Sequence, residues 1–205
     1  MLRIPFQQIK KPLITVLITA VFVVGFGGFL NYVRNRPSIP EAFTEARIAG
    51  AKDAVRMSEL IADSLKNLAE IEQLDRQWAF TGALLLVNKE QDNFTEKWEV
   101  ASSLTNQMSA MATALPGIRP TEAQQIALEA VGAQITAASH LSIYNDQLKQ
   151  LLEVLGKRLA TRGQDSSTNL QVGQLIKKMN EQANAINDLN KQFNELFVKF
   201  DKLYL

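Results

Sequence analysis

The chain has 205 residues, of which 46% are hydrophobic, and its 22 basic and 21 acidic side chains leave a formal net charge of +1. Residues 1–33 hold three basic residues and no acid, so the rest of the chain carries 19 basic and 21 acidic side chains, a net charge of −2. That balance argues against a nucleic-acid surface, which would be basic. The absence of cysteine excludes disulfides, thiolate nucleophiles and thiol metal sites. Few glycines and prolines favour long helices over a β protein.

The opening segment predicts a membrane anchor. Residues 13–33 are mostly apolar and carry no charge. As a helix they would span about 31 Å, close to the roughly 30 Å of bilayer hydrocarbon. The apolar run continues past the poor cleavage signal at residues 25–27, so we expect an uncleaved signal anchor. Residues 1–12 would then be a short N-terminal tail, and residues 34–40, with two prolines, a linker.

The charges beside this segment favour a cytoplasmic N-terminus. Arg3, Lys10 and Lys11 precede the segment, and Arg34 and Arg36 follow it. By the positive-inside rule this balance leans toward an N-terminus inside the cell. We therefore expect a single-pass protein of the inner (cytoplasmic) membrane with its bulk outside the cytoplasm, in the periplasm.

Residues 41–205 show the patterns of four amphipathic helices. The first begins near Pro40 and runs through the apolar stretch WAFTGALLLV, residues 78–87, to a predicted turn at the polar run NKEQDN, residues 88–93. The second begins at Phe94 and stops at PGIRP, residues 116–120, and the third ends near Gly163. Such helices bury their apolar stripes only by packing together. The expected fold is therefore all-α, an antiparallel four-helix bundle with long helices.

The last helix has the strictest repeat, because its apolar residues step by 3 and 4 over more than four heptads. Asparagines between the core positions, Asn190 among them, are predicted on the solvated face, and Phe197 is predicted off the core stripe. Heptads also serve coiled coils, so a homodimer through this helix is an alternative. The predicted core positions are Val172, Leu175, Met179, Gln182, Ile186, Leu189, Phe193, Leu196, Phe200 and Leu203.

The order of these elements resembles a known family type. A membrane helix, a long helix with an apolar patch, a polar turn and an aromatic-led helix are similar to the four-helix-bundle sensory domains of bacterial chemoreceptors and histidine kinases. The segment DRQWAFTGALLLVNKEQDNFTEKW, residues 75–98, carries most of this similarity. Many such sensors have an arginine where this chain has Gly82, so no ligand-binding arginine is carried over. The sequence ends at Leu205 without a signalling module, so we expect any sensing to act through another protein.

The residue patterns do not favour catalysis. His140 is the single histidine, and no nucleophile or orienting acid stands near it on the same helix face. The sequence has no HExxH motif, no phosphate-binding glycine loop and no Ser-x-x-Lys. We therefore expect no enzyme activity, no cofactor and no metal site. The basic cluster of Lys157, Arg158 and Arg162 fits a helix C-terminus, where cations offset the dipole, or alternatively an anionic partner.

The leading interpretation is a non-catalytic protein whose bundle binds a protein partner as an accessory or scaffold subunit of a membrane complex. The apolar stretch is the predicted binding surface, although ten nearly continuous apolar residues can also be core. The residues predicted to bind the partner are Trp78, Phe80, Leu84, Leu85 and Leu86.

Two other functions stay open. One is a small-molecule sensor that acts through a separate output protein, with a pocket near Trp98, His140 and Tyr144. The other is an envelope tether that self-associates through the last helix.

Overall fold

The computed structural model describes residues 38–162 and 166–205, which form helices and turns and no strand. The predicted tail, anchor and most of the linker lie outside the described residues. Among the helices that the structure describes, none is both long enough and apolar enough to cross a bilayer. The elements are α2 (Glu41–Arg76), α3 (Phe80–Asp92), α4 (Phe94–Ala114), the 3-10 turn η4 (Leu115–Gly117), α5 (Thr121–Ala160) and α6 (Ser166–Tyr204).

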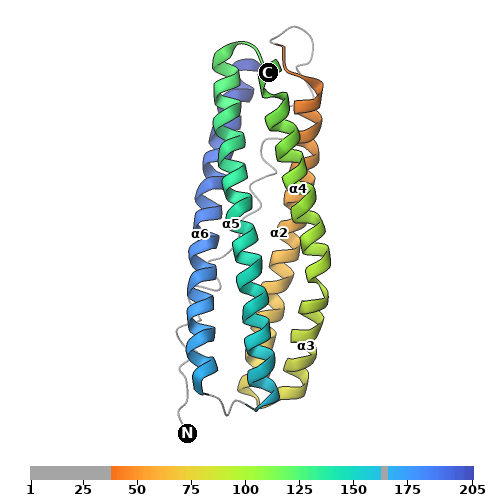
Figure 1. Ribbon diagram of the computed structural model, residues 1–205, viewed down its shortest axis with the longest axis vertical. Helices are drawn as coiled ribbons and strands as arrows, with labels where there is room; N and C mark the ends of the chain where they lie inside the picture. Colours follow the sequence, from red (N-terminus) through yellow and green to blue (C-terminus); the bar gives the residue numbers. More distant parts are fainter. Residues whose placement is uncertain (1–37, 163–165) are drawn as a thin grey trace.

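The helices run as four antiparallel rods (Figure 1). α2, α5 and α6 each form one rod, and α3 and α4 follow one another to form the fourth. α2 packs closely on α3 and α4, and α5 packs closely on α6, so the bundle consists of two helical hairpins placed side by side. The expected all-α, four-helix architecture is confirmed for the described residues.

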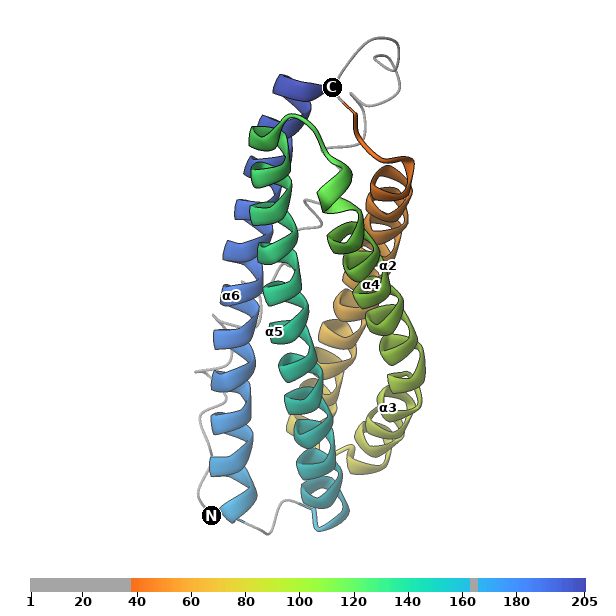
Figure 2. The same ribbon diagram turned by 45° about the horizontal axis from the view of Figure 1, so that its top comes forward.

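The first hairpin turn differs from the prediction. The chain reverses at residues 77–79, between α2 and α3, and the polar run at 88–93 is helical through Asp92. Asn93 marks only a break, after which α4 continues at an angle to α3 (Figure 2). The predicted turn was wrong because residues 88–93 look polar and solvated, whereas Glu90 and the nearby Lys97 are buried.

One continuous core joins all four rods. Among the described residues its fully buried members run from Phe43 to Phe200, with Ile39 packed against them, and the largest fully buried side chains include Tyr144, Phe43 and Phe200. Because this core joins all four rods, we expect residues 38–205 to fold as an independent unit.

The core stripe of α6 is shifted from the predicted one in its second half. Ala183, Asn190 and Phe197 are buried there, while Leu203 is 52% exposed. The predicted core positions Gln182, Leu189, Leu196 and Leu203 each stand one residue before a buried or partly buried position. Asn190 was predicted to face solvent and Phe197 to lie off the stripe, and both predictions were wrong. The heptad pattern leaves open which of two neighbouring faces of the helix is buried, and packing against the other helices decides it.

The start of α2 and the end of α6 meet at one end of the bundle (Figure 1). Arg47 donates two hydrogen bonds of 2.7 Å to the Asp201 carboxylate, and its guanidinium lies 4.0 Å from the centre of the Phe197 ring. The loop after η4 lies at the same end, where the Arg119 amide donates a hydrogen bond of 3.0 Å to the Ser38 carbonyl. A Cβ at Gly117 would come within 2.6 Å of Pro40, so this close approach requires glycine. The entry of the chain into the bundle is thereby fixed.

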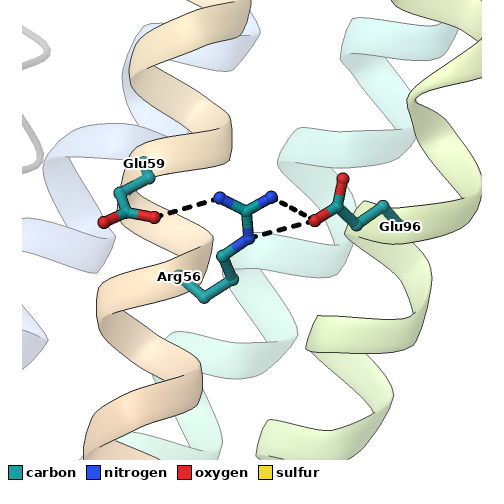
Figure 3. A network of polar contacts seen from close by, with 3 residues as sticks. All are labelled: Arg56, Glu59 and Glu96. Carbon is teal, nitrogen blue, oxygen red and sulfur yellow. Dashed lines mark hydrogen bonds and ion pairs between the residues drawn. The ribbon is translucent and has the colours of Figure 1, made fainter.

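An exposed ion network joins the outer faces of α2 and α4 (Figure 3). Arg56 of α2 donates to Glu59 on its own helix and to Glu96 on α4. These hydrogen bonds raise the pKa of the Arg56 guanidinium, and the bond to Glu96 has the larger effect. About half of each side chain is exposed, so solvent screens the charges and the network contributes little stability.

The strongest polar constraint is a buried ion pair across the α3–α4 break. Glu90 of α3 is 0% exposed and Lys97 of α4 is 1% exposed, and their charged groups are in direct contact. Ser64 of α2 donates to the same carboxylate, and Asn67 Nδ2 donates to its other oxygen at 2.6 Å. Because both charges have left water, each depends on the other and on these hydrogen bonds.

We predict that Lys97→Met in residues 38–205 lowers the free energy of unfolding by about 3–5 kcal/mol, because it leaves the Glu90 charge buried without its cation. The double variant Glu90→Gln/Lys97→Met removes both charges and keeps an oxygen that accepts from α2. It should recover most of the loss. Urea unfolding followed by circular dichroism measures both variants. A Lys97→Met variant as stable as the parent protein would contradict the buried ion pair of Glu90 and Lys97.

Candidate functional site

The predicted partner surface lies on α3 and the turn before it. Trp78 is 64% exposed and Leu85 is 66% exposed. Phe80 and Leu86 are partly buried and pack on the core, and Leu84 is also partly buried. On either side of Leu84, Leu85 and Leu86, Ala83 and Val87 are fully buried in the core. The apolar stretch is therefore neither wholly core nor wholly surface, since one side fixes α3 to the bundle and the other faces solvent. We call Trp78, Phe80, Leu84, Leu85 and Leu86 the α3 patch.

Trp78 has an unusual backbone at the tip of the hairpin. Its φ is 62°, in the left-handed region that bulky residues rarely adopt. Its amide donates to the Asp75 carbonyl at 3.1 Å, which closes the turn after α2. The indole packs edge-on against Phe80, with ring centres 5.8 Å apart and planes at 84°. The turn thus holds a large aromatic side chain outward in one orientation.

The residues predicted for a ligand pocket are not brought together at one cavity. Trp98 is 68% exposed on α4. His140 of α5 lies 2.7 Å from Gln182 of α6, joining those helices through a ring nitrogen and an amide oxygen. Tyr144 is buried and lines a cavity that includes neither of the other two. Among the described residues, no group of three or more histidine or acidic side chains is arranged to hold a metal ion.

A groove that the sequence did not indicate lies among α2, α5 and α6. It has a volume of about 50 Å³ and is open to solvent on one side. α2 and α6 face each other across a wider seam than the other neighbouring helices do, and the groove follows that seam. It is lined by Leu65, Leu68, Ile71, Glu72, Asp75, Tyr144, Leu151, Leu155, Arg158, Leu159, Val172, Ile176, Met179 and Asn180.

The charged residues of this groove gather at the end nearer the α2–α3 turn. Arg158 of α5 donates to the Asp75 carboxylate of α2 at 2.7 Å, and both side chains are largely buried. Glu72 forms an ion pair with Arg76 one turn later. The rest of the lining is aliphatic apart from Tyr144 and Asn180. The groove is therefore apolar along its length and charged at one end.

No protein-family model, curated protein or solved structure matches the chain.

Tyr144 connects the groove to the buried ion pair. Burial raises the pKa of its phenol well above the ordinary value near 10, and the negative charge of Glu90 raises it further. At a pH between the ordinary pKa of the phenol in the unfolded chain and its raised pKa in the folded chain, the unfolded chain releases the proton and the folded chain keeps it. Stability is therefore intact below about pH 10 and falls as the pH rises further.

We predict that Tyr144→Phe weakens this alkaline loss of stability, because phenylalanine has no proton to release. The measurement is the urea midpoint of residues 38–205 between pH 9 and 11. Tyr204→Phe, which removes a hydroxyl from the partly buried end of α6, is the control and should keep the alkaline loss. Equal pH profiles for Tyr144→Phe and the parent protein would contradict the buried phenol.

Proposed function

We propose that the chain is a membrane-anchored, non-catalytic binding protein, an accessory or scaffold subunit that contacts a protein partner through the α3 patch. The supporting observation is the exposure of Trp78 and Leu85 at 64% and 66% beside partly buried neighbours. In this proposal residues 13–33 anchor the chain in the inner membrane, and the bundle stands in the periplasm.

The anchor and the patch would lie at opposite ends of the bundle. The linker leads into the start of α2, and Trp78 follows the end of that helix. α2 has 36 residues and is about 54 Å long, so the patch would stand roughly that far from the membrane-proximal end. A rigid rod with a fixed reach suits a subunit that contacts a neighbour in the same membrane.

The backbone at Trp78 supports a binding role. A bulky residue in the left-handed region costs on the order of 1–3 kcal/mol, and such strain concentrates at functional positions. Here the indole is mostly exposed, so burial within the chain does not offset that cost. Tryptophan is enriched among the residues that dominate binding energy at protein interfaces.

The partly buried members of the patch lower the entropy cost of binding. Phe80 and Leu86 pack on the core, and Phe80 supports the Trp78 ring. Side chains that are already ordered lose less freedom when a partner covers them. The patch is therefore preorganised, with Leu85 held on α3, which packs against α2 and α5, and Trp78 held in the turn before it.

We predict that Leu85→Asp lowers recovery of the partner at least tenfold, because the carboxylate would be buried at the interface. The measurement is a pull-down of the full chain, carrying a C-terminal tag, from its native membranes in mild detergent. Circular dichroism should stay helical, since the side chain is 66% exposed.

The matched control is Leu128→Asp, which changes a similarly exposed leucine, 56%, on α5. It should leave recovery unchanged. Equal recovery with both variants would contradict the proposal. Loss of helicity in Leu85→Asp would instead assign Leu85 to the core.

A further inference from the structure

We propose that a cavity among α2, α4, α5 and α6 is an internal hydration site, in which ordered water hydrogen-bonds to the amide side chains of Gln134 and Asn190. The cavity lies beside the middle of α2 and has a volume of about 30 Å³. This inference goes beyond the proposed function and does not depend on the α3 patch. The cavity is lined by Ala54, Met57, Ser58, Ile61, Leu104, Gln134, Ala137, Ala138, Leu141, Ile186 and Asn190.

Two amide side chains of this lining need partners. Gln134 of α5 is 3% exposed and Asn190 of α6 is 7% exposed. Within the described residues, no group donates a hydrogen bond to Gln134 Oε1 or to Asn190 Oδ1. A buried amide that has left water and gains no hydrogen bond destabilises the fold. Because both amides line the same cavity, a small molecule that donates to their oxygens from inside it offsets this cost.

The volume and the lining specify water as that molecule. One water needs about 10–15 Å³ of such space, so the cavity has room for about two waters and is too small for an organic ligand. An ammonium ion would fit, but none of the described lining residues is acidic, so its charge would be buried without a counter-ion. Water is neutral and both donates and accepts, so it can bond to an amide whichever way that amide is turned.

A hydrated cavity also gives a reason for the face that α6 presents to the core. The heptads allow either Leu189 or Asn190 to face inward, and the structure buries Asn190. Turning α6 by one residue would bring Leu189 toward the cavity and leave Gln134 of α5 as its one amide. Water held between two amides therefore favours the observed face, as buried polar groups in other helical assemblies fix the register of their helices.

The test is oxygen-17 magnetic relaxation dispersion of the full chain in detergent, which counts the water molecules that tumble with the protein. Gln134→Met/Asn190→Leu replaces both amides by apolar side chains of similar size, so no amide is left without a partner. We expect this double variant to hold one or two fewer waters than the parent protein. An equal number of waters in the two proteins would overturn the proposal.

The matched control is Gln125→Met/Asn184→Leu, which makes the same two changes at exposed positions of α5 and α6. It should hold as many waters as the parent protein. An equal loss of waters in the control would assign them to the protein surface and overturn the internal site.

A third variant keeps the proposal testable if the first double variant loses its helicity in circular dichroism. Ala138→Leu keeps both amides and fills the cavity from a partly buried position on α5. It should also hold fewer waters than the parent protein, because the added side chain takes their space. An unchanged number of waters in Ala138→Leu would show that the water does not lie in this cavity.

Discussion

The buried contact between Glu90 and Lys97 is the interaction on which the arrangement of the first hairpin depends. It bridges the break at Asn93, so that α3 and α4 can change direction and still act as one rod. Through Ser64 and Asn67 the same carboxylate also fixes both helices to α2. Nonpolar contacts tolerate small shifts in register, whereas a buried charge must meet its partners. The pair therefore sets the position of α3 and, with it, the side of the apolar stretch that faces solvent.

This pair also explains where the sequence misled the interpretation of the fold. The all-helical class, the start of the first helix near Pro40 and the stop at residues 116–120 follow from local signals that the structure keeps. The turn at residues 77–79 has no glycine or proline to mark it and uses Trp78 in a left-handed conformation. Residues 88–93 looked like a turn because the partners that bury Glu90 are distant in sequence, on α2 and α4. In α6 the heptads predicted a core stripe, but only packing could choose Phe197 and Asn190 over their neighbours.

The two candidate sites differ in how far the sequence could indicate them. The α3 patch was predicted residue by residue from an apolar run too long for one stripe, and the structure divides that run into a buried side and an exposed side. The groove had no sequence signal, since aliphatic residues at core spacing look alike whether or not a helix covers them. It exists because α2 and α6 face each other across a wide seam. Its charged end was visible only as a basic cluster near the end of α5.

We propose above that the exposed side of α3 is a surface for another protein. A photo-crosslinking amino acid placed at Leu85 of the full chain, in its native membrane, tests this claim without detergent or loss of helicity. The same group at Leu128 serves as the control. We expect an adduct with one membrane protein from Leu85 and no such adduct from Leu128. Absence of an adduct at Leu85, or the same adducts from both positions, would show that this side of α3 is not a partner surface.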